Sequence, residues 1–392
     1  MIARTLTSAL ERALAQFPLV SVSGPRQAGK TTLARAVRPD YAYVNLDLPQ
    51  LRDYAREDPL GFLTQYRGGV VLDEVQRVPE LFPYLKHVTD ERGDVGEYIL
   101  TGSQHFLLLE RITESLAGRV AALRLLPLSL SELHQGGFGV DSWQAASWRG
   151  GYPRMYDADI HPGDFFPSYV GTYVERDVRL VTQVRQLSTF RDFLALCAGR
   201  VGQLLNLTEL GNNLGVDAKT VRGWISVLEA TFVAYRLPPY FENFDRRIVK
   251  SPKLYFYDTG LACHLLGIES PRQLDTHFAR GALFENAVVN ELRKRRLHAG
   301  REPRQHFYRD SNQREIDLVQ LVGGHLEATE IKAARTLNAR FFGPLRTFRG
   351  LATRPGREVF TRVIYAGDEA QTRADTRVIP WGAFAAGSEA ET

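Results

Sequence analysis

The sequence predicts an α/β fold, with a parallel sheet first and an α+β region last. Three observations support this prediction. Short apolar strands alternate with helical segments between residues 17 and 128, which is typical of a parallel sheet. Helical spacing then continues to about residue 200. From about residue 275 onward a helix precedes several strands, which indicates a separate α+β arrangement.

At 392 residues the chain is too long for one hydrophobic core, so we expect several domains. The changes of pattern place the boundaries. We predict a sheet domain at 1–128, a helical lid at 129–195, a winged helix-turn-helix at 196–268, an α+β domain at 269–385 and a tail at 386–392.

The composition excludes several classes of protein. Apolar residues make up 44% and charged residues 24%, which is ordinary for a folded globular protein. The two cysteines, Cys197 and Cys263, lack metal-ligand spacing, so we expect neither a zinc site nor a disulfide scaffold. No apolar run has the length of a signal peptide or of a bilayer-spanning helix. We therefore expect a cytoplasmic protein with no membrane partner.

The individual strands of the first sheet follow from their apolar runs and their flanking turns. The Ser129–Leu133 segment after the last of them has the pattern of a helix-capping start. The predicted strands are 18–23, 43–47, 70–73, 98–101 and 120–126.

A glycine-rich loop directly follows the first of these strands and precedes a predicted helix. The loop has the spacing G-x-x-x-x-G-K-[ST], and the strand-loop-helix context makes a chance match improbable. Backbone N–H groups in such a loop surround phosphates, and the helix N-terminus adds its positive dipole. We expect Lys30 to reach the β- and γ-phosphates of ATP and Thr31 to bind Mg²⁺. The predicted nucleotide-binding residues are Gly24, Pro25, Arg26, Gln27, Ala28, Gly29, Lys30, Thr31 and Thr32.

The strand at 70–73 ends in two carboxylates, Asp73 and Glu74, which an apolar strand tolerates best beside a cation. We predict that Asp73 holds Mg²⁺ through water and that Glu74 polarises the attacking water. A strand that simply emerges into solvent is the alternative.

Three further segments are weaker candidates. Ser103 or Gln104 follows the fourth strand, whose end faces the ligand crevice, and can sense the γ-phosphate. Arg119 can act as an arginine finger toward a neighbouring subunit, or it can be a plain surface residue. Gly150–Pro153 can cover the adenine, or it can be a simple turn.

These motifs together resemble the prokaryotic AAA-type ATPases whose ATPase is fused to a conserved C-terminal domain of unassigned role. The resemblance covers nearly the whole chain, and its motifs are specific in combination. It implies an ATPase, a winged-helix segment and an endonuclease-like C-terminal fold. The segments that carry it are Ser23–Thr31, Leu72–Gln76, Leu126–Leu133, Gly150–Pro153, Tyr173–Val178 and Lys253–Leu261.

A helix-turn-helix pattern is present between residues 207 and 228. Its second helix presents basic and polar side chains near its N-terminal end, and a basic hairpin follows as a possible wing. A structural or protein-docking role is the alternative. The predicted DNA contacts are Lys219, Thr220, Arg222, Arg246, Arg247, Lys250 and Lys253.

A hairpin with a Gly323-Gly324 turn places two acidic side chains opposite each other. Its register pairs Val322 with His325 and therefore Asp317 with Glu330, and Lys332 shares the face of Glu330. Such a pair repels unless a divalent cation lies between the carboxylates. Glu285, on a helix predicted at 281–295, can complete the metal site.

This arrangement resembles the PD-(D/E)xK nuclease core, with Ile316 in place of the usual proline. An inert fold that only binds nucleic acid or a partner is the alternative. The leading hypothesis is therefore an ATP- and Mg²⁺-dependent, DNA-processing homo-oligomer. The competing hypotheses are a nucleotide-controlled docking switch and a ring-forming DNA motor.

Overall fold

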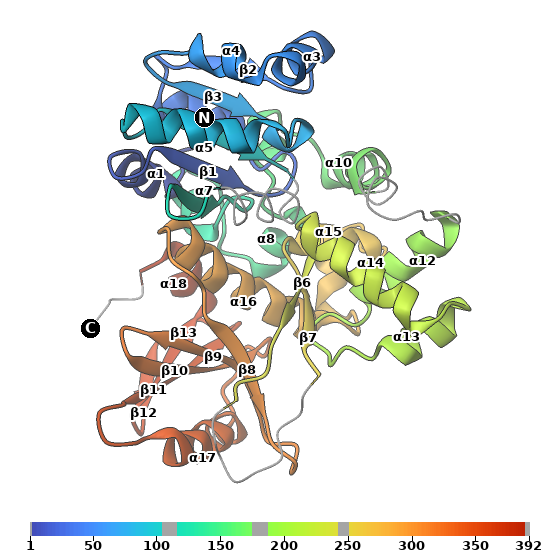
Figure 1. The fold of residues 1–392 in the computed structure, drawn as a ribbon. Coiled ribbons are helices and arrows are strands. Elements are labelled where there is room, and N and C mark those ends of the chain that lie inside the picture. Colours follow the sequence, from blue (N-terminus) through green and yellow to red (C-terminus); the bar gives the residue numbers. More distant parts are fainter. Residues whose placement is uncertain (1, 104–115, 175–186, 242–250, 389–392) are drawn as a thin grey trace.

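Five parallel strands form the first sheet, in the order β2-β3-β4-β1-β5. Its strands β1, β2 and β3 are labelled in the upper part of Figure 1. The computed structural model describes residues 2–103, 116–174, 187–241 and 251–388. The predicted α/β class and the order of strands along the chain are confirmed. The strands are β1 (Leu19–Ser23), β2 (Ala42–Asn45), β3 (Val70–Asp73), β4 (Tyr98–Gly102) and β5 (Val120–Arg124).

Helices cover both faces of this sheet, so its central strands are apolar on both sides. Leu72 belongs to one apolar cluster, with Phe62 and Leu85, whereas its neighbour Val71 belongs to the cluster that contains Leu10. The helices are α1 (Leu6–Leu14), α2 (Lys30–Val37), α3 (Pro49–Glu57), α4 (Pro59–Thr64), the short η1 (Val75–Arg77) and α5 (Leu81–Arg92).

The middle of the chain is mainly helical, as expected. Ser129 and Glu132 form the capping box that the sequence indicates. The elements up to the second helix of the helix-turn-helix are α7 (Leu130–Gln135), α8 (Trp143–Arg149), α9 (Pro153–Asp157), α10 (Pro162–Tyr169), η2 (Val170–Val174), α12 (Leu187–Ala198), α13 (Leu207–Leu214) and α14 (Ala218–Ala230). A two-stranded sheet, β6 (Ala234–Leu237) with β7 (Lys253–Phe256), follows, and then α15 (Thr259–Leu265) and η3 (Pro271–Asp275).

A long helix introduces the C-terminal sheet, whose six strands run in the order β12-β13-β11-β10-β9-β8. The predicted hairpin register is present from the His325–Val322 pair to the Thr329–Leu318 pair. The elements are α16 (Arg280–His298), β8 (Gln305–Arg309), β9 (Glu315–Val322), β10 (His325–Lys332), η4 (Ala339–Phe341), α17 (Phe342–Ala352), β11 (Val359–Tyr365), β12 (Gln371–Arg373), β13 (Thr376–Pro380) and α18 (Trp381–Ala386).

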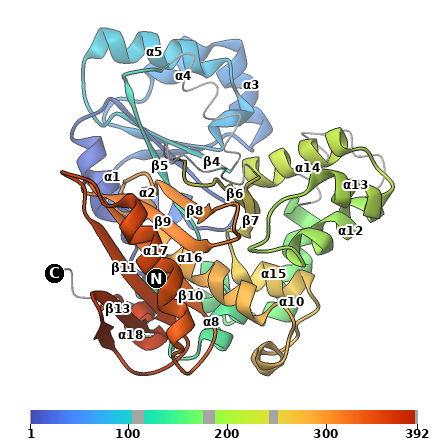
Figure 2. The ribbon, with the colours of Figure 1, turned by 90° about the horizontal axis from the view of Figure 1, so that it is seen from below.

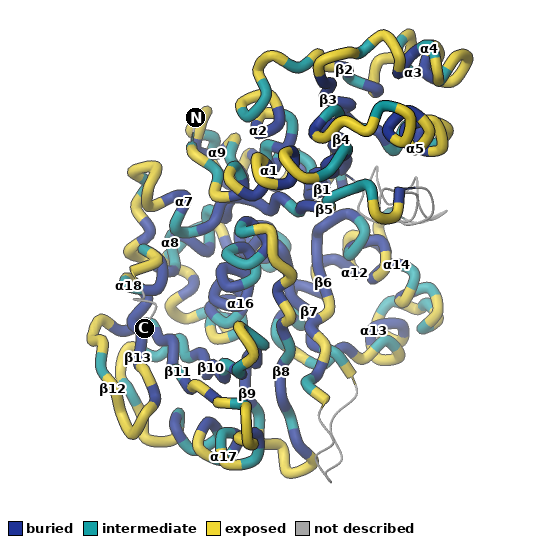
Figure 3. Tube along the Cα trace, turned by 60° about the vertical axis from the view of Figure 1, so that its left-hand side comes forward, coloured by how far each residue is buried: buried dark blue, intermediate teal, exposed yellow. Residues whose placement is uncertain are grey.

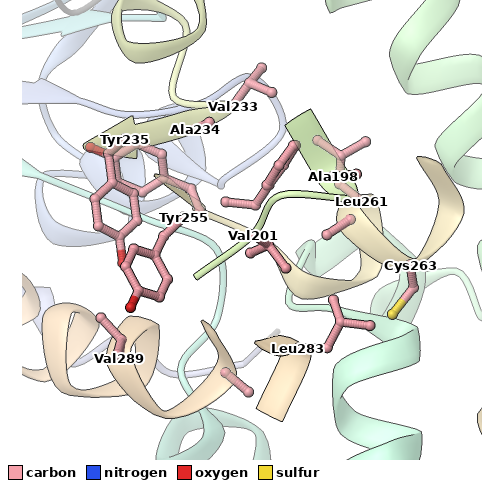
Figure 4. Packing of buried hydrophobic residues seen from close by; sticks show 14 of the residues in the cluster. Ala198, Val201, Val233, Ala234, Tyr235, Tyr255, Leu261, Cys263, Leu283 and Val289 are labelled. Carbon is pink, nitrogen blue, oxygen red and sulfur yellow. The ribbon is translucent and has the colours of Figure 1, made fainter. Parts of the chain in front are cut away.

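One apolar core joins the middle segment to the C-terminal region. It extends from Leu126 to Ala385 and includes residues of the predicted lid, of the helix-turn-helix and of α16. In Figure 4, Tyr235 and Tyr255 of the small sheet lie close to Val289 of α16. The predicted domain limits stay a prediction, because the segments on either side of residue 195 share this core.

Helix α16 lies between the two large sheets and is mostly buried along its length (Figure 3). In Figure 2, the C-terminal strands and helices α12 to α14 lie on opposite sides of the molecule. Among the described residues, no helix is both long enough and apolar enough to cross a membrane.

Candidate functional site

The glycine-rich loop joins the end of β1 to the start of α2, as the sequence predicts. Gly24 needs to be glycine, because a Cβ there would lie 2.0 Å from the carbonyl oxygen of Leu125. Gly29 has a φ of 91°, a left-handed conformation that glycine adopts without strain. The Arg26 guanidinium lies over the Tyr173 ring, 5.3 Å from its centroid.

Lys30 folds back into this loop. Its Nζ donates hydrogen bonds to the carbonyl oxygens of Gly24 (2.9 Å) and Pro25 (2.8 Å), and the side chain is buried. A phosphate oxygen can replace these carbonyls as the acceptor. The predicted phosphate-binding role therefore requires only a change of hydrogen-bond partner.

Asp73, at the end of β3, accepts hydrogen bonds from three hydroxyl groups. Thr31 Oγ1 lies 2.9 Å and Tyr43 Oη 2.7 Å from Oδ2, and Thr101 donates to Oδ1. Burial, followed by the hydrogen bond to Asp73, raises the pKa of Tyr43. The structure thus brings Thr31 and Asp73 together, and the oxygen donors gathered here fit Mg²⁺.

Glu74 directly follows β3 in a left-handed conformation, with φ of 56°. Its Oε2 accepts a hydrogen bond from Ser103 Oγ at 2.9 Å and another from Gln76. The structure therefore places Ser103 beside Glu74. The other predicted sensor, Gln104, lies outside the described residues.

Arg119 lies far from the loop of its own chain. Its backbone oxygen bonds to the amide of Leu19, at the start of β1, whereas the loop follows the end of that strand. Its guanidinium forms an exposed two-pronged ion pair with Asp90 of α5. A finger role toward a neighbouring subunit stays a prediction.

A recess of about 190 Å³ lies beside the loop. The N-terminal segment lines it with Arg4, the loop and α2 with Gly29 and Thr32, and α9 with Pro153. Arg4 donates to the carbonyl oxygens of Ala28 at 2.7 Å and Leu126 at 2.6 Å.

The Gly150–Pro153 segment has two environments. Pro153 lines the recess, but the amide of Gly151 donates to the buried Asp258 carboxylate at 2.7 Å. A Cβ on Gly150 would lie 2.3 Å from Asp258 Oδ1, and a Cβ on Gly151 would lie 2.6 Å from the carbonyl oxygen of Leu128, so both positions require glycine for close packing. Only Pro153 of this segment therefore lies where it can contact a base.

The predicted DNA contacts divide into three groups. Lys219 and Arg222 are exposed on α14, while Thr220 is half-buried and its amide donates to Asp217 at the helix start. Lys253 is only 2% exposed, so its predicted contact with DNA phosphates is wrong. The predicted contacts Arg246, Arg247 and Lys250 lie outside the described residues.

In the C-terminal sheet, Asp317 and Glu330 share Lys332. Lys332 Nζ lies 3.1 Å from Asp317 Oδ2 and 2.7 Å from Glu330 Oε1. Asp317 Oδ2 also accepts the backbone amide of Ile331 at 2.7 Å. Burial, with the charge of Asp317, raises the pKa of Glu330 to about 8. Its Oε2 is buried with no hydrogen-bond partner in the described part of the chain.

Glu285 extends from α16 toward this pair and forms an ion pair with a second lysine, Lys253. Lys253 Nζ lies 3.0 Å from Glu285 Oε1 and 2.5 Å from Glu315 Oε1, and Tyr255 donates to Glu285. Burial, with the charge of Asp317, raises the pKa of Glu285. We call these seven residues the carboxylate–lysine cluster: Lys253, Tyr255, Glu285, Glu315, Asp317, Glu330 and Lys332.

The cluster is not arranged as a ready metal cage. Across the described residues, no group of three or more acidic, histidine or cysteine side chains is positioned to hold a metal ion. Lysine ammonium groups lie between the carboxylates instead. The predicted metal role of Glu285, Asp317 and Glu330 therefore stays a prediction that requires Lys332 to move.

Sequence reasoning missed Arg4, Tyr43 and Tyr255 as neighbours of these sites. Tyr43 faces Asp73 only because β2 pairs beside β3, which the sequence does not reveal. Arg4 precedes α1 and carries no motif. One signal in the sequence could have indicated a buried ion pair near Tyr255. Lys253 is a single lysine at the start of an otherwise apolar and aromatic strand.

Comparisons with known proteins divide the chain into three matched regions. An AAA domain matches residues 16–134, a domain of unknown function (DUF8612) matches 140–272, and a second domain of unknown function (DUF4143) matches 280–384. The AAA match includes the loop, Asp73, Glu74 and Ser103.

Some proteins are similar over longer stretches of the chain. An uncharacterized protein of Mycobacterium tuberculosis is 32% identical over 337 residues, which cover 85% of this chain and 74% of the relative. An uncharacterized protein of Haemophilus influenzae is 24% identical over 212 residues, 51% of each chain. Among solved structures, a Walker-type ATPase of Pyrococcus abyssi is similar with 16% identity and a TM-score of 0.47, over 68% of this chain and 96% of that one.

Nearly a third of the residues are identical to the mycobacterial protein over most of both chains. The chain therefore belongs to the family of that protein, and it is an AAA-type ATPase with a C-terminal DUF4143 domain.

Proposed function

We propose that the chain hydrolyses ATP in a Mg²⁺-dependent reaction and couples this hydrolysis to DNA binding and processing. The observation that carries the ATPase part is the convergence of Lys30, Thr31, Asp73 and Glu74 at one edge of the first sheet. Bound Mg²⁺ would offset the negative charge of the phosphates.

Each residue has a role that follows from its position. Thr31 and Asp73, already 2.9 Å apart, would hold the cation between them. Lys30 would exchange its carbonyl acceptors for phosphate oxygens. Glu74, released from Ser103, would orient the attacking water and accept its proton. The recess beside Gly29 and Arg4 would receive the adenine.

DNA binding is supported by the exposed Lys219 and Arg222 near the start of α14, the second helix of a helix-turn-helix pattern. The small sheet β6–β7 follows this helix, where a wing would lie. Basic side chains at this position can contact phosphates and base edges.

The first experiment measures ATP hydrolysis with and without single-stranded, duplex and branched DNA, while a denaturing gel follows the DNA strands. Stimulation by DNA supports the coupling. A hydrolysis rate that no DNA changes, together with undetectable DNA binding, would overturn it in favour of a partner-docking switch.

A salt titration of DNA affinity tests the helix-turn-helix. The Lys219→Ala, Arg222→Ala double variant should reduce the slope of log affinity against log salt by about 1.8, since each phosphate contact contributes about 0.9. Arg373→Ala, an exposed arginine on β12, is the matched control and should retain the slope. If the double variant and the control had equal slopes, Lys219 and Arg222 of α14 would not contact DNA phosphates.

A second candidate activity is metal-dependent DNA cleavage at the carboxylate–lysine cluster. The observation that favours it is the buried Glu330 Oε2, which has no hydrogen-bond partner among the described residues and lies beside Asp317, where the charge of Glu285 also acts on it. This oxygen would become a ligand of a divalent cation, and the displaced Lys332 would then be free to approach a phosphate.

Calorimetry with Mn²⁺ tests the metal site separately from DNA cleavage. Asp73→Asn should be the background for both titrations, so that the nucleotide-site metal does not contribute. In this background the C-terminal signal should be present and Asp317→Asn should abolish it. The same heat of binding with and without Asp317→Asn would refute the metal site.

Assembly into a homo-oligomer is the remaining part of the proposal. Arg119 lies at the edge of the sheet opposite the loop, where it can face a neighbouring copy. We expect a mixture of Glu74→Gln and Arg119→Ala chains to recover ATPase activity that neither variant has alone. No recovery at any mixing ratio would mean that Arg119 does not act between subunits.

A further inference from the structure

Three side chains of helix α16 form hydrogen bonds with the backbone of residues 126–130, the segment that follows the last strand of the nucleotide sheet. His298 Nε2 accepts the Leu126 amide at 3.2 Å, Lys294 Nζ donates to the Leu128 carbonyl at 2.9 Å, and Glu291 Oε2 accepts the Leu130 amide at 2.8 Å. The three side chains lie along one face of the helix, and their partners are alternate residues of an extended segment. All three are at least 92% buried.

The same segment is tied to the phosphate-binding loop. Arg4 donates to the carbonyl of Ala28 in the loop and to the carbonyl of Leu126, and its Nε lies 3.3 Å from Glu132 Oε1. Glu132 Oε1 in turn lies 3.4 Å from His298 Nδ1. Arg4 therefore contacts the loop, the segment and the partner of His298 at once.

The other end of α16 carries Glu285, in the carboxylate–lysine cluster. Glu285 and His298 are thirteen positions apart, a distance of about 20 Å along a helix. Asn286 and Asn290 also bond to the backbone of Phe256, which fixes the helix to the small sheet. One rigid element thus connects the surroundings of both candidate sites.

A nucleotide must change the loop at the point that Arg4 holds. Lys30 now bonds to carbonyls of the loop, and phosphates would take over Lys30 and turn loop amides inward. Ala28 lies in that loop and is fully buried, so any shift of its carbonyl displaces Arg4. The other partners of Arg4 are Leu126 and Glu132, and both contact His298 of α16. A displacement of Arg4 is therefore transmitted to the helix.

We propose that Arg4 and His298 form a coupling path through which nucleotide binding at the loop repositions α16 and with it Glu285. The C-terminal cluster is thereby regulated by the nucleotide. This proposal rests on the ATP site of the proposed function, but it requires neither DNA binding nor a metal at the cluster.

Hydrogen exchange of the α16 amides, with and without a non-hydrolysable ATP analogue, tests the path. In the wild type, saturating analogue should change the exchange rates of residues 285–298 by about 5-fold or more. His298→Phe lies outside the nucleotide recess and should still bind the analogue, but its α16 should no longer respond. Arg301→Gln, an exposed residue just beyond α16, is the control and should respond like the wild type.

Two results would overturn the proposal: α16 exchange that is insensitive to the analogue in the wild type, or an unchanged response in folded His298→Phe. Reciprocity supplies a second readout, because coupling requires His298→Phe to change analogue affinity as well, by about 5-fold or more. Arg4→Gln should lose the response too, and thermal unfolding checks that each variant is folded. If the chain does not bind the analogue, the ATP site itself fails, which is a different outcome from a bound analogue without a response in α16.

Discussion

The carboxylates of two sites in this molecule are stabilised in different ways. In the nucleotide site, Asp73 accepts from the hydroxyls of Thr31, Tyr43 and Thr101. In the carboxylate–lysine cluster, Lys332 lies between Asp317 and Glu330, and Lys253 lies between Glu285 and Glu315. Asp73 is thus held by neutral hydroxyl donors, whereas the cluster carboxylates contact ammonium groups in addition to neutral donors such as Tyr255.

The difference decides how readily each group can take a cation. A hydroxyl can rotate and become a ligand or a spectator, so Mg²⁺ at Asp73 meets no competing charge. An ammonium must leave before a metal enters, and its departure exposes buried negative charge. The nucleotide site is therefore ready for a cation, whereas the cluster must first be rearranged.

The largest expected effect isolates the catalytic carboxylate. Glu74→Gln should lower the ATP hydrolysis rate by about 1,000-fold and leave nucleotide binding intact, because the amide cannot accept the proton of the attacking water. Steady-state turnover and analogue binding measure the two properties. Glu315→Gln, in the cluster, is the matched control. A comparable loss of turnover in Glu315→Gln would mean that the cluster also takes part in ATP hydrolysis, so the two sites would not be independent.

Removal of a charged partner should cost more stability in the cluster than removal of a charge in the nucleotide site. Lys253→Met removes the ammonium partner of Glu285, whose side chain is only 15% exposed, and should lower the free energy of unfolding by about 3 kcal/mol, whereas Glu315 keeps its ion pair with Arg309. Asp73→Asn keeps an oxygen acceptor for its hydroxyl donors and should cost about 1 kcal/mol. Urea denaturation of both variants measures this difference, and equal losses would contradict the comparison.

A third buried carboxylate, Glu132, extends the comparison to pH. Burial alone would raise its pKa, but the hydrogen bond to His298 and the charge of Arg4 outweigh burial and lower the pKa below the ordinary 4.5. Its stabilising contribution is thus complete above about pH 4.5 and is lost as the pH falls further. Glu132→Gln should be less stable at pH 7 and should lose about half as much Tm as the wild type between pH 5 and pH 3.5.

Thermal melts across that pH range, read by circular dichroism, check this prediction. Glu57→Gln, an exposed residue at the end of α3, is the control. A variant at Glu132 whose Tm falls as steeply with acid as that of the wild type would mean that other groups dominate acid unfolding.

The smallest expected effect concerns one of the three hydroxyls at Asp73. Tyr43→Phe removes a single donor and leaves Thr31 and Thr101 in place, so the KM for Mg-ATP should change by about 5-fold, equivalent to about 1 kcal/mol. Tyr84→Phe, an exposed tyrosine on α5, is the control. If kcat changed as much as KM, Tyr43 would act in the hydrolysis step itself and would not only support Asp73.

Local sequence information predicted the first sheet and the hairpin well, because each depends on neighbouring residues. Apolar runs buried on both faces indicated the strands of the first sheet, and the G-x-x-x-x-G-K-[ST] spacing located the loop at the end of β1. The Gly323-Gly324 turn set the register that brings Asp317 toward Glu330. The prediction that Lys253 contacts DNA was wrong because it relied on the positive charge of the side chain alone. The acidic residues of α16 and β9 that pair with Lys253 are 32 or more positions away in the sequence.

The sequence by itself determined the α/β class, the phosphate-binding loop, the two acidic residues after β3 and the hairpin of the C-terminal sheet. In each case the information lies within about ten residues, where backbone geometry and turn chemistry act directly. Only the tertiary structure decided that Tyr43 reaches Asp73, that lysines neutralise the cluster, and that Arg4 and His298 meet at Glu132. Apart from the hairpin pairs of Lys332, those contacts join residues 30 to 166 positions apart, from Tyr43–Asp73 to Glu132–His298, and strand order and helix packing bring them together.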